Sequence, residues 1–271
     1  MTSERPWIVV QAGGEDTHLQ SLTRALCGRD LPRQFAVIAG AKSLLQATIE
    51  LAATLTHLDR VLVVVSAAHA AIARDQIARY PGVEAVVQPR DLDTAPAQLL
   101  ALARILARDP LGRVVFLPAT HFVANPGPLV AAIRASGLAG VRDRASVIRV
   151  TPLHSELEDE WIAVGQVTTF WDLSREHVPE QAARFERYIA AMGTTREWRA
   201  LQEAYAYMVP ASFSHEVLAN ALRVAVIPVD GTGWSDWDSP RQVIQSLQGT
   251  PMFDELLGRI RGSASPYEVA S

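Results

Sequence analysis

Residues 7–51 read WIVVQAGGEDTHLQSLTRALCGRDLPRQFAVIAGAKSLLQATIEL, and this segment predicts how the fold begins. Residues 7–10 form an apolar run typical of a buried strand, and Gly13 and Gly14 follow it as a turn. A long polar loop is expected after the turn. A first strand that ends in a glycine turn places backbone N–H groups at the carboxyl edge of a parallel sheet, where phosphate groups are commonly bound.

Ser43 is expected to begin the first helix. Gln46 lies three residues further on, so the pair forms the capping box of a helix N-terminus. The apolar side chains at helical spacing are Leu44, Leu45, Ile49, Ala52 and Leu55.

The next hundred residues alternate strand and helix patterns. Strands are expected at 60–65, 83–87 and 113–117. Helices are expected at 67–80 and 125–136. A further helix is expected to begin with Thr94 as its cap and to end at Asp109–Pro110. The run RVLVVV at 60–65 is typical of a strand that is covered on both faces. This alternation predicts an α/β fold with a doubly wound, mostly parallel sheet, right-handed crossovers and helices on both faces.

The pattern loosens after residue 140. We expect a strand at 146–150, a solvated acidic segment at 156–160, helices at 168–177, 180–192 and 196–208, a loop with a short helix at 210–222, and a strand at 223–229. GTGWSDWDSP (231–240) is predicted to be a tight loop. A helix opened by Ser239, Pro240 and Gln242 and a last helix at 252–261 then follow.

Composition limits the class of protein. The chain has 271 residues, of which 49% are hydrophobic, which is enough for one large packed domain. Its formal net charge is −4, and no block of lysine and arginine stands out, so neither a nucleic acid nor an anionic membrane is an expected partner. The single cysteine, Cys27, rules out an internal disulfide; an ordinary thiol is favoured over a reactive one.

The N-terminal residues show no export signal, because their apolar run of four residues is shorter than the core of about 7–15 that a signal peptide needs. The most apolar run, 61–65, is far below the ~20 residues of a membrane span. A cytoplasmic location is therefore expected.

The first segment resembles the sugar-1-phosphate nucleotidyltransferases, most closely the mannose-1-phosphate guanylyltransferases. That family begins roughly L-A-G-G-x-G-T-R-L-x-P-L-T, followed by P-K-Q-F and a G-x-x-S-L-L-Q-x-T helix. The residues of this chain that match are Ala12, Gly13, Gly14, Thr17, Leu19, Leu22, Thr23, Pro32, Gln34, Phe35, Gly40, Ser43, Leu44, Leu45, Gln46 and Thr48. The chain differs at charged and turn positions: Asp16 replaces a glycine, His18 an arginine, Ser21 a proline and Arg33 the lysine.

Three later segments continue the resemblance. QPRDLDTAP (88–96) is similar to E-P-x-x-x-N-T-A-P, which in the family contacts the nucleotide; Asp93 stands where asparagine is usual, and a simple strand-to-helix turn is the alternative. LPATH (117–121) is similar to L-P-x-D-H, with Thr120 in place of the aspartate that holds magnesium; a structural role is the alternative for His121. GWSDWDSP (233–240) is similar to G-W-S-D-x-G-x-W, although its aspartates could instead cap the next helix.

The resemblance implies which residues act. Ala12, Gly13, Gly14, Thr17, His18, Gln88, Thr94, Ala95 and Pro96 would bind the nucleotide, Arg33 would neutralise phosphate charge, and Asp236, with Asp238 as a partial substitute for the missing acid, would hold Mg²⁺. The loss of one electrostatic group typically costs roughly 3–4 kcal/mol of transition-state stabilisation. We therefore expect the loss of two or three such groups to weaken the activity.

Two functions follow from the resemblance. One is nucleotidyl transfer from a nucleoside triphosphate, GTP by resemblance, to a sugar 1-phosphate such as mannose 1-phosphate; the other is a degenerate relative that binds a nucleotide or a partner without turnover. A nicotinamide dehydrogenase is disfavoured, since no G-x-G-x-x-G follows the first strand. The family's E-K-P and W-N-S-G segments are not found between 140 and 208, so the sugar pocket is expected to be rebuilt or lost.

We expect one domain over residues 1–262, with a nucleotide-binding half (1–140), a reduced sugar-binding half (141–262) and a flexible tail (263–271). The sequence leaves open whether the last helix packs on the core or at a homo-oligomer interface.

Overall fold

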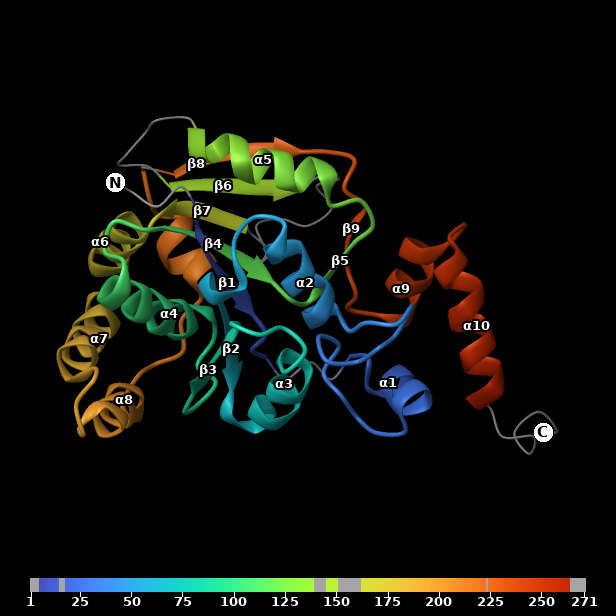
Figure 1. The fold of residues 1–271 in the computed structure, drawn as a ribbon, viewed down its shortest axis with the longest axis horizontal. Helices are drawn as coiled ribbons and strands as arrows, with labels where there is room; N and C mark the ends of the chain where they lie inside the picture. Colours follow the sequence, from blue (N-terminus) through green and yellow to red (C-terminus); the bar gives the residue numbers. More distant parts are fainter. Residues whose placement is uncertain (1–4, 15–17, 139–144, 151–161, 223, 264–271) are drawn as a thin grey trace.

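The structure, a computed structural model, describes residues 5–14, 18–138, 145–150, 162–222 and 224–263. A seven-stranded sheet of order β3-β2-β1-β4-β7-β6-β8 lies at its centre, and β5 and β9 form a separate two-stranded ribbon (Figure 1). The strands are β1 (Trp7–Gln11), β2 (Val61–Ser66), β3 (Glu84–Gln88), β4 (Arg113–Pro118), β5 (His121–Val123), β6 (Ala145–Val150), β7 (Ile162–Gln166), β8 (Val224–Val229) and β9 (Trp234–Asp236).

The first half of the sheet is parallel. β1 lies between β2 and β4, with Val9 opposite both Leu62 and Phe116, and β3 continues the parallel order beside β2. β7 is antiparallel to both β4 and β6, whereas β6 and β8 pair in parallel. The prediction of an α/β fold with a mostly parallel sheet is confirmed, and its antiparallel element is β7.

Successive residues of the strands point to opposite faces of the sheet, which explains the two large cores. Val9 belongs to the core beneath α4 (Thr94–Arg108), α6 (Val167–His177), α7 (Pro179–Ala191) and α8 (Glu197–Ala206). Its neighbour Val10 belongs to the opposite core, beneath α2 (Leu44–Ala53), α3 (Ala70–Ile77) and α5 (Gly127–Leu138). Helices thus cover both faces, as Figure 1 shows.

A third apolar core lies beyond the carboxyl edge of the sheet. There α1 (Gln20–Cys27), near the N-terminus, packs beside α10 (Pro251–Ser263), near the other end of the chain, and α10 in turn contacts α9 (Pro240–Leu247) (Figure 1). Arg259 of α10 donates hydrogen bonds to the carbonyl oxygens of Val37 and Ile38. The last helices therefore hold the loop that leads from the glycine turn to α2. The remaining short elements are η1 (Leu58–Arg60), η2 (Ala67–His69) and the π-helix η3 (Phe213–Leu218).

The capping box predicted at Ser43 is in place, and at Ser239 the N-cap half of the predicted box is found. The Ser43 hydroxyl accepts the N–H of Gln46, whose side chain accepts the N–H of Ser43. The Ser239 hydroxyl likewise accepts the N–H of Gln242 at the start of α9. The strand predicted at 146–150 is confirmed as β6, and the other predicted strands and helices are found within a few residues of their predicted ends.

Four local predictions were wrong or incomplete. The expected polar loop contains α1, which ends at Gly28 in the left-handed conformation, a helix-end signal within the loop. Asp93, not Thr94, caps α4. Residues 234–236 form β9 rather than part of a tight loop, and β7 was not predicted. The acidic segment 156–160 lies outside the described residues, as does the tail from 264.

None of the helices in the described part of the chain is long and apolar enough to span a membrane.

Candidate active site

A polar pocket of about 200 Å³ lies at the carboxyl edge of the parallel strands. The ends of β1, β2, β3 and β4 all contribute to it, as expected for a parallel α/β sheet. The described residues that line it are Gln11, Gly13, Gly14, Arg33, Val64, Gln88, Asp91, Asp93, Thr94, Ala97, Pro118, Thr120 and His121.

The glycine turn is held from behind by Gln34. The fully buried side-chain amide of Gln34 donates to the carbonyl oxygens of residues 12, 13 and 14, at 3.1–3.3 Å. Gly14 has a positive φ of 89°, a conformation that glycine adopts at little cost. Because the carbonyls are tied down, the Gly14 N–H faces the opposite way and donates to a carboxylate oxygen of Asp91 at 3.0 Å.

Arg33 brings the beginning and the end of the chain together. Its Nη1 atom lies 2.6 Å from the Oδ1 atom of Asp236 and forms a second ion pair with Asp238. The Arg33 side chain is only 12% exposed, so solvent weakens this attraction little. Burial acts to raise the pKa of the Asp238 carboxyl. A side-chain hydrogen bond with Asp236 and the positive charge of Arg33 outweigh burial and leave that pKa below its usual value.

His121 lies behind this ion cluster. In the β5–β9 ribbon it is directly opposite Asp236, and its Nε2 atom is 3.7 Å from the Asp236 carboxylate. Its Nδ1 atom is 3.0 Å from the Thr120 hydroxyl, and its ring stacks on Trp234 with centroids 4.7 Å apart. Burial lowers the His121 pKa to about 4, against the opposing effect of Asp236, so the imidazole is neutral at pH 7.

The segment 88–96 is tied to the helical layer behind the pocket. Buried Gln88 accepts a hydrogen bond from the Tyr205 hydroxyl through its Oε1 atom, at 3.2 Å. Asp93 has a φ of 71°, which is rare outside glycine and asparagine, and its carboxylate caps α4 by accepting the N–H of Thr94. The Thr94 hydroxyl accepts the N–H of Phe213 at 2.9 Å.

The structure brings together some of the predicted nucleotide-binding residues and not others. Of these, Gly13, Gly14, Gln88 and Thr94 line the pocket, together with Arg33 and Thr120, whereas Asp236 and Asp238 are not among its described lining residues. Ala12, Ala95 and Pro96 are buried and are not among the described lining residues; the N–H groups of Ala12 and Ala95 bond to the carbonyls of Val64 and Ala211. His18 is exposed and its charge acts on Asp238, while Thr17 lies outside the described residues.

Sequence reasoning missed three residues that shape this site: Gln34, Asp91 and Tyr205. Gln34 belongs to a matched motif but was given no role. Asp91 occupies a variable position of its motif, and Tyr205 lies more than a hundred residues from Gln88, so no local pattern could have indicated either contact.

The arrangement does not fit a magnesium site built from Asp236 and Asp238. Mg²⁺ is usually held by one or two carboxylates together with substrate phosphates. Here a guanidinium cation is paired with both carboxylates, and the neutral Thr120 hydroxyl bonds to His121. Among the described residues, no group of three or more His, Cys, Asp or Glu side chains is placed to hold a metal ion.

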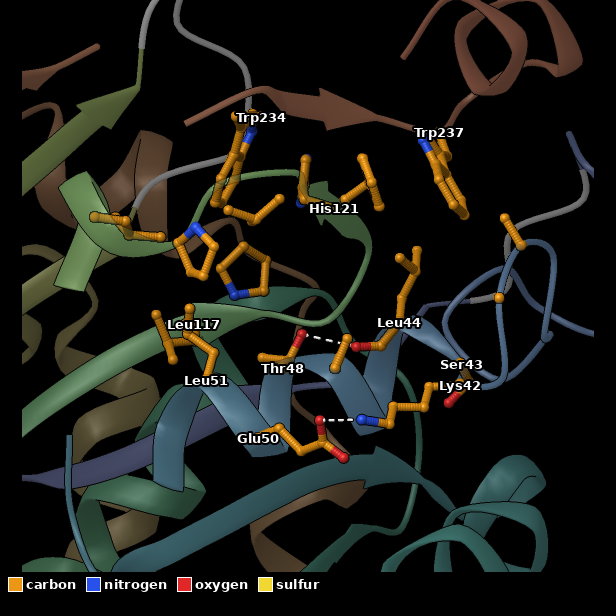
Figure 2. A pocket seen from close by; sticks show the side chains of 18 of the residues that line it. Lys42, Ser43, Leu44, Thr48, Glu50, Leu51, Leu117, His121, Trp234 and Trp237 are labelled. Atoms are coloured by element: carbon orange, nitrogen blue, oxygen red, sulfur yellow. Dashed lines mark hydrogen bonds and ion pairs between the residues drawn. The ribbon is translucent and has the colours of Figure 1, made fainter. Parts of the chain in front are cut away.

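A larger cavity, of about 720 Å³, adjoins the site on the α2 side of His121 (Figure 2). Side chains of α2, such as Leu44 and Leu51, face Trp234 and Trp237 of the GWSDWDSP segment across it. Among the described residues that line it, Lys42 is the only Lys or Arg, and it is paired with Glu50. Such an apolar lining does not suit a sugar phosphate.

Comparison with known proteins gives the family. Residues 8–152, more than half of the chain, match the family model described as "Nucleotidyl transferase". No significantly similar protein was found among curated sequences.

Several solved structures have the same fold. A protein of Thermus thermophilus described as mannose-1-phosphate geranyltransferase is 23% identical, with a TM-score of 0.74 over 90% of this chain and 80% of that one. The mannose-6-phosphate isomerase of Helicobacter pylori is 14% identical, with a TM-score of 0.63 over 84% and 99%. The inositol-1-phosphate CTP transferase of T. maritima is 14% identical, with a TM-score of 0.52 over 98% and 100%.

At these identities the solved structures show a shared fold, whereas the family model matches the sequence that forms β1 to β4 and the pocket between them. This chain belongs to the nucleotidyl transferase family.

Proposed function

We propose that this protein transfers a nucleotidyl group from a nucleoside triphosphate, GTP in the first instance, to a sugar 1-phosphate such as mannose 1-phosphate. Family membership supports the reaction class. The choice of substrates is supported by the sequence resemblance. It is also supported by the similar Thermus protein, which is described as a mannose-1-phosphate enzyme.

One observation carries the proposal. A backbone amide, Gly14 N–H, and a guanidinium, Arg33, line one pocket at the carboxyl edge of the sheet, and each is bonded to a carboxylate. Carboxylate oxygens resemble phosphate oxygens in charge and in hydrogen bonding, so both groups are suited to binding anionic oxygens. An NTP would place its phosphates between them.

The chemistry needs no covalent intermediate. An oxygen of the sugar phosphate attacks the α-phosphorus, the bond from that phosphorus to the bridging oxygen breaks, and pyrophosphate leaves with the electron pair. The protein contributes position and charge: the Gly14 N–H and Arg33 would hold phosphate oxygens, and Gln88 belongs to the segment that by resemblance contacts the base. Magnesium, which the resemblance implies, stays a prediction for this chain, and none of these roles depends on it.

A second candidate is a binding protein without turnover. Thr120 brings no charge where the family has an aspartate, and carboxylates of the chain already pair with both phosphate-binding groups. These features favour weak or absent catalysis without excluding nucleotide binding.

Both candidates are tested in one experiment. Purified protein is titrated with GTP, with and without Mg²⁺, while thermal stability is followed, and pyrophosphate release is assayed with mannose 1-phosphate. GTP at 100 times its dissociation constant should stabilise the fold by about 2.7 kcal/mol. Replacing Arg33 by Gln should reduce both signals, and any pyrophosphate release should fall by roughly 10²–10³ if Arg33 acts on the transition state.

The outcomes separate the candidates. Stabilisation with pyrophosphate release supports the transferase, and stabilisation without release supports the binding protein. If no nucleoside triphosphate shifts the melting temperature, both are wrong. Cytoplasmic location, the domain limits at 140 and 262, and a homo-oligomeric state stay predictions.

A further inference from the structure

Asp238 is an extra carboxylate in the candidate active site. The resembling loop has glycine at its position, and the chain keeps the preceding aspartate, Asp236. The two carboxylates both contact the Nη1 atom of Arg33, so one guanidinium is shared between two anions.

The two aspartates are held differently. Asp236 is part of the β9 strand, is 16% exposed and lies beside His121, so the ribbon itself determines its place. Asp238 follows the strand, is 46% exposed and is positioned by its side-chain interactions with Arg33 and Asp236 rather than by strand pairing. Asp238 can therefore leave Arg33 at a lower cost than Asp236 can.

The charged residues that line the polar pocket make the Arg33–Asp238 ion pair important for anion binding. Arg33 is the only Lys or Arg among the described residues that line the polar pocket, and Asp91 and Asp93 line the same pocket. An incoming polyphosphate must compete with Asp238 for Arg33 and also meets two further carboxylates. The anion-binding strength of this site is thus limited by the protein's own acids.

We propose that Asp238 competes with ligand phosphate for Arg33 and so sets the affinity of the site for polyphosphate groups. The inference rests on the proposed function in taking phosphate as the ligand. It requires neither a particular base or sugar nor turnover.

The probe is inorganic tripolyphosphate, which carries no base. Its dissociation constant is measured by calorimetry without added metal for the unaltered protein and for D238N, which keeps the size of the side chain and removes its charge. We expect about three- to tenfold tighter binding by D238N. D230N is the matched control, because Asp230 is an exposed acid between β8 and β9 whose loss changes the net charge equally. It should leave the affinity within twofold.

The mechanism is tested in a double-mutant cycle with R33Q. If Asp238 acts through Arg33, the gain from D238N disappears in the R33Q background; a gain that persists there means general charge repulsion and overturns the proposal. Equal affinities of the unaltered protein and D238N, or no detectable binding by either, also overturn it. This experiment does not measure GTP turnover, so its result is independent of the transferase assay. Tighter tripolyphosphate binding by D238N would support this inference even if the protein proved inactive and the transferase proposal failed.

Discussion

His121 shows how one buried residue links the chemistry of the site to the stability of the fold. Its imidazole is buried between Trp234, Thr120 and Asp236, and Arg33 and Asp238 are the other charged groups that act on it. Burial disfavours its charged form more than the nearby carboxylates favour it, so its pKa falls to about 4. Neutral His121 is therefore a structural element of the ribbon at pH 7.

This pKa predicts a pH dependence with a definite sign. The unfolded chain takes up a proton on His121 near pH 6.5, whereas the folded protein does so only near 4. The contribution of neutral His121 to the free energy of unfolding is therefore complete above about pH 6.5. It is lost progressively as the pH falls to about 4, by up to roughly 3 kcal/mol.

The measurement is urea unfolding of the unaltered protein and His121→Gln between pH 7 and 4. The difference in stability between the two should shrink by that amount across this range. A pH-independent difference for His121→Gln would show that this histidine does not titrate as described.

The β5–β9 ribbon is the element on which the site depends. It brings Asp236 opposite His121, and its two stacked aromatic pairs, His121 with Trp234 and Phe122 with Trp237, hold it together across the strands. Just before β9, Gly233 has a φ of 59°, and a Cβ atom there would lie 2.7 Å from the Cβ of Ala124. The close approach of the two backbones requires glycine.

Gly233→Ala is therefore expected to destabilise the fold by about 2–4 kcal/mol, from the left-handed backbone and the steric overlap together. Gly231→Ala provides the matched comparison. Gly231 also has a positive φ, of 74°, but a Cβ atom added there would have no other atom within 4 Å. That variant should lose only about 1–2 kcal/mol. Denaturant unfolding measures both, and equal losses would mean that the ribbon adjusts to the added methyl group.

At the scale of the whole molecule, the helical layer of α6 to α8 reaches the candidate active-site pocket through Tyr205. This buried hydroxyl lies 3.2 Å from both the Gln88 side-chain oxygen and the Pro96 carbonyl. Its ring also packs edge-to-face on Phe185 of α7. The second half of the chain thus orients Gln88, the residue that the resemblance assigns to the nucleotide.

Tyr205→Phe should cost about 1 kcal/mol of stability, because it removes one buried hydrogen bond and keeps the ring. It should also weaken GTP binding but leave tripolyphosphate binding unchanged, since Gln88 is expected to contact the base rather than the phosphates. Tyr207→Phe, at a side chain that is 82% exposed, is the control and should change neither. A loss of tripolyphosphate binding in Tyr205→Phe would instead mean that the whole pocket is disturbed. Calorimetric titration with the two ligands distinguishes these results.

The family, the parallel strands and the N-caps of α2 and α9 were accessible from the sequence alone. Residues 61–65 are apolar on both faces, and Ser43 and Gln46 are three residues apart, so burial and capping follow from neighbours along the chain. The glycine turn and the segments 88–96 and 117–121 likewise place residues at the carboxyl edge. Strand periodicity and local capping act over a few residues, and a sequence displays them directly.

Only the tertiary structure decided what those residues do to one another. The metal role of Asp238 stays a prediction, and the structure pairs Asp238 with Arg33, which lies 205 residues away in the chain. The phosphate role of the Gly14 amide likewise stays a prediction, and in the structure Asp91 accepts its hydrogen bond. A charged side chain takes whichever partner the folded backbone brings within hydrogen-bonding distance, about 3 Å. That partner is chosen by the sheet order and the ribbon pairing rather than by spacing in the sequence.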